Sequence, residues 1–171
     1  VEVRITNQDT AVPTQNGEIG MIEVKGPNIF TGYWNMPEKT AEEFREDGFF
    51  ITGDLGQLDE AGYVQIVGRS KDLIISGGYN IYPKEIELLR DEQEGVLENA
   101  VIGVTHPDFG EGVVGVLVAK PGFTLDTAAI STAIYSKIAR FKQPKLLFVL
   151  PELPRNTMGK VPKNVLRDQY A

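Results

Sequence analysis

The chain has 171 residues, of which 42% are hydrophobic and 24% are charged, so it is long and apolar enough to bury a core. Its net charge of −7 argues against a protein that coats nucleic acid, because such proteins present a net basic face. It has no cysteine and one histidine, which excludes disulfides, thiolate metal sites, a cysteine nucleophile and an ordinary zinc site.

No segment approaches the roughly 20 apolar residues that span a bilayer, and the N-terminus lacks the basic and then apolar pattern of a signal peptide. We therefore expect a soluble, cytoplasmic protein with neither a membrane nor a nucleic-acid partner. Because the chain begins at Val1 with a strand-like segment, we also expect that other residues preceded it.

The first 69 residues have the pattern of an antiparallel, β-rich unit. Apolar runs alternate with glycine, proline and asparagine, as in strands joined by turns; the runs are VEVRI, GMIEVKG and GYVQIVG. A helix is expected at residues 37–47, because a proline and acidic residues open it and a glycine follows it. We expect Tyr33 and Trp34 to pack in the core beside this helix.

Beyond Asp72 helices and strands alternate, which predicts a compact domain with a short sheet flanked by helices. Residues 99–104 and 113–119 are apolar runs typical of buried strands. Asp126 is expected to cap a helix with isoleucines along its core face. The other expected elements are a helix that opens at Pro83, a strand at 146–150 and a short helix at 161–169.

The pattern of expected elements changes near residues 70–72, from strands and turns to alternating helices and strands. We therefore place a domain boundary between residues 1–70 and residues 71–171. The predicted fold class is α+β, with a β-rich subdomain followed by a small C-terminal α+β domain. Residues 137–171 hold eight basic and two acidic residues. A phosphate-bearing ligand would bind at this basic end, although a solvated surface explains the same charge.

Three stretches carry residues that suit ligand chemistry. ITGD at residues 51–54 presents Asp54 after a glycine, where its carboxylate can accept hydrogen bonds from both hydroxyls of a ribose. GRSKDLIISGGYNIYPKEIE offers the planar donors of Arg69 and a Ser-Gly-Gly turn that a ligand can approach closely. PRNTMGK ends in Lys160, a cation that could neutralise charge on phosphorus. Taken singly, each stretch also has a purely structural explanation: Asp54 as a turn cap, the Ser-Gly-Gly segment as a hairpin turn and Lys160 as a solvated lysine.

Taken in this order, ITGD, GRSKDLIISGGYNIYPKEIE and PRNTMGKV resemble the later signature motifs of the adenylate-forming enzymes. That family includes acyl-CoA synthetases, the adenylation domains of peptide synthetases and firefly luciferases. The resemblance begins at GEIGMIEVKGPNIFTGYW and covers nearly the whole chain. It implies that a carboxylate attacks the α-phosphate of ATP to give an acyl-adenylate and diphosphate. The small domain, mobile in this family, then rotates, and the thiol of CoA displaces AMP.

The resemblance also implies roles for individual residues. Lys160 would be the catalytic residue, reaching the α-phosphate in the first step, and Lys71 would be the hinge, where many relatives carry aspartate. The implied nucleotide-binding residues are Asp54, Arg69 and Ile66. The implied CoA-binding residues are Ser76, Gly77, Gly78, Tyr79, Phe141 and Lys145. ATP, Mg²⁺ and CoA are the implied cofactors, with Mg²⁺ bound mainly by an upstream domain and no metal ligand in this chain.

Residues 31–87 look most like the malonyl-CoA synthetases, which implies malonate among small carboxylic acids. A medium-chain fatty acid or coumarate CoA ligase and a carrier-loading adenylation module are alternatives, and a non-catalytic binding domain is an alternative of another class. The family builds its acyl pocket upstream, so we expect the C-terminal third of a longer enzyme, inactive without its missing N-terminal domain. Acetylation of Lys160 would remove its charge and act as an off-switch.

Overall fold

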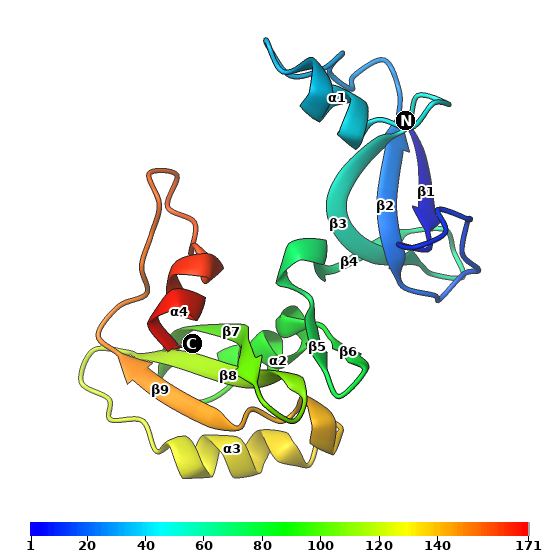
Figure 1. The fold of residues 1–171 in the computed structure, drawn as a ribbon. Coiled ribbons are helices and arrows are strands. Elements are labelled where there is room, and N and C mark those ends of the chain that lie inside the picture. Colours follow the sequence, from blue (N-terminus) through cyan, green and yellow to red (C-terminus); the bar gives the residue numbers. More distant parts are fainter. Residues whose placement is uncertain (171) are drawn as a thin grey trace. The chain divides into compact units, whose positions relative to one another are not determined.

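The computed structural model describes residues 1–170 (Figure 1). The chain divides into two compact units, Val1–Lys71 and Asp72–Ala171, which are called here the N-terminal and C-terminal units. This division lies one residue beyond the boundary expected from composition. Strands dominate the N-terminal unit, and strands and helices share the C-terminal unit, so the fold class is α+β. No helix among the described residues is long and apolar enough to cross a membrane.

The N-terminal unit is a four-stranded antiparallel sheet with strand order β1-β2-β3-β4. Its strands are β1 (Glu2–Thr6), β2 (Gly20–Lys25), β3 (Phe50–Leu58) and β4 (Val64–Arg69). Register shifts interrupt the pairing of β3 with both of its neighbours. Such irregularities bend a strand, and Figure 1 shows the resulting curvature of β3.

Helix α1 (Pro37–Glu43) ends four residues earlier than the predicted helix. Phe44 is already extended, with φ −120° and ψ 134°, and forms an isolated bridge with Phe50. The rings of these two residues lie 5.2 Å apart, and the ring of Phe30 lies 5.1 Å from that of Phe50. Tertiary packing of these aromatic rings therefore ends the helix before its acidic run is complete.

The expectation that Trp34 packs in the core is wrong, because this side chain is 89% exposed. Its neighbour Tyr33 packs edge-on against Phe30, with ring centroids 5.0 Å apart. Phenylalanine and tyrosine rings thus fill the space beside α1, and the adjacent Trp34 is left on the surface.

The C-terminal unit contains a five-stranded sheet with order β6-β5-β8-β7, in which β9 also pairs with β8. Its strands are β5 (Ile74–Ser76), β6 (Tyr79–Ile81), β7 (Val96–His106), β8 (Gly110–Ala119) and β9 (Leu146–Leu150). The pairing of β8 with β9 is parallel and the other pairings are antiparallel.

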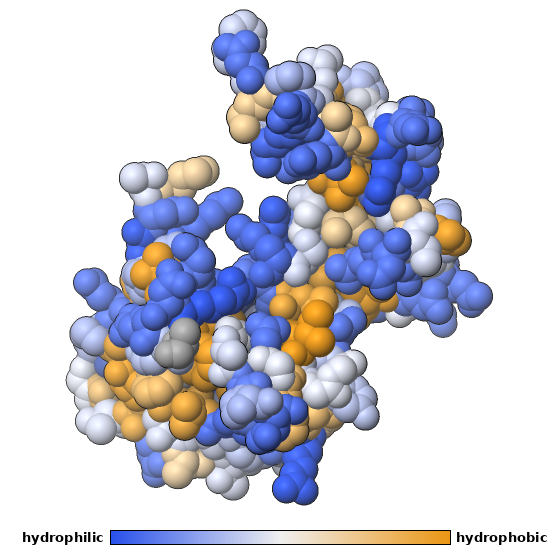
Figure 2. All heavy atoms as spheres, in the orientation of Figure 1, coloured by the Kyte–Doolittle hydropathy of each residue, from blue (hydrophilic) through white to orange (hydrophobic). Residues whose placement is uncertain are grey.

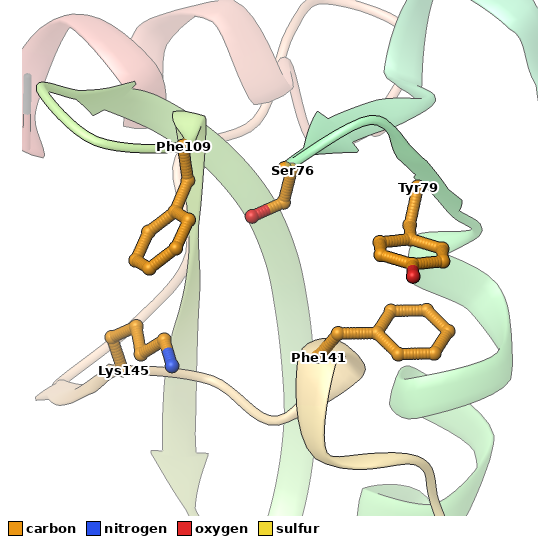
Figure 3. A pocket seen from close by; sticks show the side chains of 6 residues that line it. Ser76, Tyr79, Phe109, Phe141 and Lys145 are labelled. Carbon is orange, nitrogen blue, oxygen red and sulfur yellow. The ribbon is translucent and has the colours of Figure 1, made fainter.

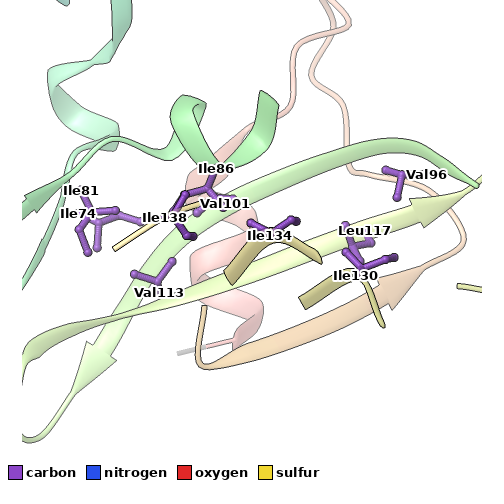
Figure 4. Packing of buried hydrophobic residues seen from close by; sticks show 10 residues of the cluster. All are labelled: Ile74, Ile81, Ile86, Val96, Val101, Val113, Leu117, Ile130, Ile134 and Ile138. Atoms are coloured by element: carbon purple, nitrogen blue, oxygen red, sulfur yellow. The ribbon is translucent and has the colours of Figure 1, made fainter. Parts of the chain in front are cut away.

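Helices cover both faces of this sheet. Helices α2 (Pro83–Asp91) and α3 (Thr127–Tyr135) pack on one face, and α4 (Lys163–Tyr170) packs on the other. The first face holds a cluster shown in Figure 4, made of Ile74, Ile81, Ile86, Val96, Val101, Val113, Leu117, Ile130, Ile134 and Ile138. The second face holds Ala100, Ile102, Val114, Val116, Val118, Leu153 and Leu166.

Successive residues of β7 alternate between these clusters, since Val101 belongs to the first and Ala100 and Ile102 to the second. Burial on both faces explains why the two central strands are nearly continuous apolar runs. The predicted cap of α3 is confirmed, because Asp126 Oδ1 accepts hydrogen bonds from the N–H groups of Ala128 and Ala129, each at 3.0 Å.

Candidate functional site

Asp54 and Arg69 lie opposite each other on β3 and β4. The guanidinium Nη1 of Arg69 donates a hydrogen bond of 2.9 Å to Oδ1 of Asp54. Gly53 makes room for this pair, because a Cβ there would lie 3.2 Å from Nη2 of Arg69, and its φ of +73° disfavours other residues. Gly53 lies within β3, where the register of β3 against β2 shifts.

The backbone that carries Asp54 is held in place by the preceding threonine. The N–H of Asp54 donates to Oγ1 of Thr52 at 3.0 Å, and the Thr52 hydroxyl donates to the carbonyl of Ile22 at 2.8 Å. The side chains of Asp54 and Arg69 remain 30% and 49% exposed, so a ligand can reach both. A carboxylate beside a guanidinium suits a group that combines hydroxyls with phosphate. Ile66, on the same strand as Arg69, is 66% exposed.

A cluster that the sequence did not indicate lies near this pair. The phenol of Tyr33 and the ammonium of Lys39 both donate hydrogen bonds to the carboxylate of Glu43. The hydrogen bond from Tyr33, followed by that from Lys39, lowers the pKa of Glu43, and the positive charge of Arg69 adds to this effect. The spacing of Lys39 and Glu43 on a helix was the available signal for their contact, whereas Tyr33 is brought in only by the fold.

A pocket in the C-terminal unit gathers most of the residues that were expected to bind CoA. It has a volume of about 160 Å³ and is lined by Ser76, Gly77, Tyr79, Phe109, Phe141 and Lys145 (Figure 3). The remaining expected residue, Gly78, lies in the same turn as Gly77 without lining the pocket. The lining comes from the β5–β6 hairpin, the β7–β8 turn and the segment between α3 and β9.

The turn at Gly77 and Gly78 is a two-residue hairpin loop, since Ser76 pairs with Tyr79. The φ angles of the two glycines are +57° and +82°, as a type I′ turn requires. The N–H of Gly77 donates to the carbonyl of Phe109 at 2.8 Å, which ties the hairpin to the β7–β8 turn. The hairpin interpretation of this motif is therefore correct, and the hairpin forms one wall of the pocket.

The other walls are aromatic and cationic. The rings of Tyr79 and Phe141 stack with centroids 4.5 Å apart and planes 23° apart. Nζ of Lys145 lies 5.7 Å from the ring centroid of Phe109, on the opposite side of the pocket in Figure 3. Sequence reasoning missed Phe109, because only the pairing of β5 with β8, at Ser76 and Gly110, brings this turn to the hairpin. Such a pocket suits a ligand that carries both a flat ring or alkyl chain and an anion.

Lys160 lies apart from the pocket lining, in the loop of residues 151–162 that joins β9 to α4. Figure 1 shows this loop extending past the end of α4, and in Figure 2 its tip is white to light orange, with hydrophilic residues below the tip. The side chain of Lys160 is exposed. Lys71 lies in a 3₁₀ turn (Ser70–Asp72) at the junction of the two units.

Within residues 1–170, no group of three or more His, Asp or Glu side chains is placed to hold a metal ion.

Residues 85–160 match the family model of the AMP-binding enzyme C-terminal domain. The chain therefore contains an AMP-binding enzyme C-terminal domain.

Relatives of this chain include proteins named as CoA ligases. Indoleacetate--CoA ligase from Aromatoleum aromaticum is 44% identical over 91% of this chain and 30% of its own length. Long-chain-fatty-acid--CoA ligase from Bacillus subtilis is 42% identical over 94% of this chain and 28% of its own length. A crystal structure of ATP-bound MatB from Rhodopseudomonas palustris is 58% identical, with a TM-score of 0.93 over 99% of this chain and 34% of that one. The chain thus spans about a third of the length of its relatives.

Proposed function

We propose that this chain is the C-terminal part of an AMP-forming acyl-CoA ligase, which converts a carboxylate, ATP and CoA into acyl-CoA, AMP and diphosphate. The observation that carries the proposal is the pocket under the Gly77–Gly78 hairpin. It joins aromatic rings, a glycine turn and a lysine in a chain whose named relatives are CoA ligases. This combination fits the adenine ring, pantetheine arm and phosphates of CoA.

In the first step, a carboxylate oxygen bonds to the α-phosphorus of ATP and the bond to diphosphate breaks. Asp54 accepts hydrogen bonds from the ribose hydroxyls, and Arg69, which pairs with it, donates to the same ribose or to phosphate. The ammonium of Lys160 donates to the α-phosphate and carboxylate oxygens, where negative charge accumulates in the transition state. Lys160 is therefore assigned to electrostatic stabilisation.

In the second step, the sulfur of CoA bonds to the acyl carbon, AMP leaves with the bonding electrons, and the thiol proton passes to solvent. The Gly77–Gly78 turn lets the pantetheine arm approach the backbone closely. Tyr79, Phe109 and Phe141 offer faces for the adenine ring, and Lys145 offers charge to a phosphate. Rotation of the C-terminal unit about Lys71 would take the enzyme from the first step to the second, since hinge residues absorb such backbone changes.

We propose malonate as the acid. We also propose that the enzyme is cytoplasmic. The resemblance of residues 31–87 to malonyl-CoA synthetases supports malonate, and the similarity to MatB favours the same acid. The identity to MatB is 58%, against 42–44% for the ligases named for indoleacetate and long-chain fatty acids. The acyl pocket is assigned to the upstream domain that the proposal requires.

The test joins this chain to its natural upstream sequence and measures AMP and thioester with ATP, Mg²⁺, CoA and one acid at a time. The acids are malonate, acetate, octanoate and coumarate, and we expect malonate to give the highest kcat/KM. A higher kcat/KM with one of the other three acids would overturn malonate as the substrate and leave the ligase proposal intact. If an acid is adenylated but transferred only to a carrier-bound pantetheine, the carrier replaces CoA as the acceptor. If neither AMP nor thioester forms with any acid, the ligase proposal is overturned.

A further inference from the structure

The tip of the loop that carries Lys160 has a closed pattern of hydrogen bonds centred on Asn156. The side-chain Oδ1 of Asn156 accepts from the N–H of Met158 at 3.0 Å and from the N–H of Lys160 at 2.9 Å. The N–H of Asn156 donates to the carbonyl of Lys160 at 2.9 Å. One residue therefore binds both polar backbone groups of Lys160.

The backbone between the two residues folds to permit this contact. The N–H of Gly159 donates to the carbonyl of Asn156 at 2.9 Å, and the φ of Gly159 is +76°, a conformation that glycine adopts without strain. This turn brings Lys160 back beside Asn156. A side-chain amide that accepts from nearby N–H groups is a common means of fixing such a turn.

Both sides of the tip are attached to the body of the C-terminal unit. Arg155, which precedes Asn156, forms an ion pair with Glu98 on β7 and donates to the carbonyl of Gly159 at 2.9 Å. On the other side, α4 begins at Lys163 and is tied to α2 through Glu87, with 2.7 Å between Nζ and Oε1. The backbone of Lys160 is thus tied through Asn156 to a tip that is attached at both ends, and Lys160 itself is exposed.

We propose that Asn156 is a positioning residue for the first step, which fixes the backbone of Lys160 so that its ammonium is presented in one direction. This inference rests on the role proposed above for Lys160. A cation stabilises a transition state best when it is oriented beforehand, and a displacement of about 1 Å can lower a rate about 100-fold. Without the amide oxygen, the tip keeps its anchors and the backbone bond to the carbonyl of Lys160, but it loses the bonds to the N–H groups of Met158 and Lys160.

The test uses the complete enzyme with its upstream domain and compares Asn156→Ala, Asn156→Asp, Lys160→Ala and the double variant Asn156→Ala/Lys160→Ala. Thr157→Ala is the matched control, because this exposed neighbour makes no side-chain hydrogen bond within the described residues. Adenylation is measured as acid-dependent exchange of diphosphate into ATP, and the second step is started with supplied acyl-adenylate and CoA.

We expect Asn156→Ala to lower kcat of adenylation about 10- to 100-fold, with a smaller change in the KM for ATP. Asn156→Asp keeps the acceptor oxygen and should recover most of this loss, whereas Thr157→Ala should match the wild type. The second step should be unchanged in all of them. Because Asn156 acts through Lys160, the double variant should be no slower than Lys160→Ala.

Two results would overturn the proposal: adenylation by Asn156→Ala at the wild-type rate, or an additional loss in the double variant as large as in the single one. A failure of Asn156→Asp to recover activity would also count against it. A separate result bears on the proposed function, since normal adenylation by Lys160→Ala would remove the role of Lys160 itself.

Discussion

At the scale of single residues, the sequence indicated chemistry where a residue type is unusual in its local context. The glycine pair before Tyr79, the arginine after a glycine at Arg69 and the lysine that ends PRNTMGK all stand out in this way. Phe109 and Glu43 do not, because an aromatic residue in a turn and a glutamate on a helix are ordinary. Their places beside Lys145 and Tyr33 depend on contacts between distant segments.

The contact between Tyr33 and Glu43 makes a prediction about pH. Because the hydrogen bond from Tyr33 is the largest cause of the lowered pKa of Glu43, Tyr33→Phe should raise that pKa toward its ordinary value of 4.5. The wild-type contact stabilises the fold above about pH 4.5 and loses this effect as the pH falls through the folded-state pKa. An NMR titration of the Glu43 carboxyl group measures the shift.

Tyr63→Phe is the control for this titration, because Tyr63 is 70% exposed and its hydroxyl makes no hydrogen bond within residues 1–170. The pKa of Glu43 should not change in that variant. An unchanged pKa in Tyr33→Phe as well would show that Tyr33 does not bind the ionised carboxylate.

At the scale of elements, the periodicity of apolar residues predicted both central strands of the C-terminal unit and the helix capped by Asp126. The proline, acidic and glycine signals placed the end of α1 too late, because the aromatic packing of Phe44 ends the helix before the acidic run is complete. No sequence pattern indicated how α2 packs against β8. There, Arg90 is 1% exposed and lies over Gly115, where a Cβ would be 1.9 Å from its Nη1.

Arg90 is a buried cation whose Nε and Nη1 have no hydrogen-bond partner among the described residues. Burial lowers its pKa from 12.5 to about 10. We predict that Arg90→Met raises the free energy of unfolding by about 1–3 kcal/mol, because it removes a buried charge with two unpartnered nitrogens and keeps much of the volume. Urea unfolding of this chain at pH 7 measures the change, with the slope m expected to stay constant.

The pH dependence of this effect has a definite sign. Since the folded-state pKa of Arg90 lies below the ordinary value, the wild type gains stability as the pH rises from about 10 toward 12.5. The advantage of Arg90→Met should therefore shrink over that range. A variant that unfolds at lower urea concentration than the wild type at pH 7 would show that the guanidinium is compensated in the fold.

At the scale of the whole molecule, composition indicated two parts, and the chain does divide between residues 71 and 72. Each unit holds its own set of candidate residues: Asp54 and Arg69 in the first, the pocket under the Gly77–Gly78 hairpin and Lys160 in the second. The acid that the enzyme uses could not be read from the sequence alone, since the chain spans about a third of its relatives and those relatives are named for different acids.

The most direct test of this account measures both steps separately in the complete enzyme carrying Lys160→Ala or Lys145→Ala. We predict that Lys160→Ala slows adenylation at least about 100-fold and leaves thioester formation from supplied acyl-adenylate intact. Lys145→Ala should leave adenylation intact and raise the KM for CoA about tenfold, the loss expected for one charge-assisted contact. If both variants impair both steps to the same extent, the assignment of Lys160 and of the pocket to different steps is wrong.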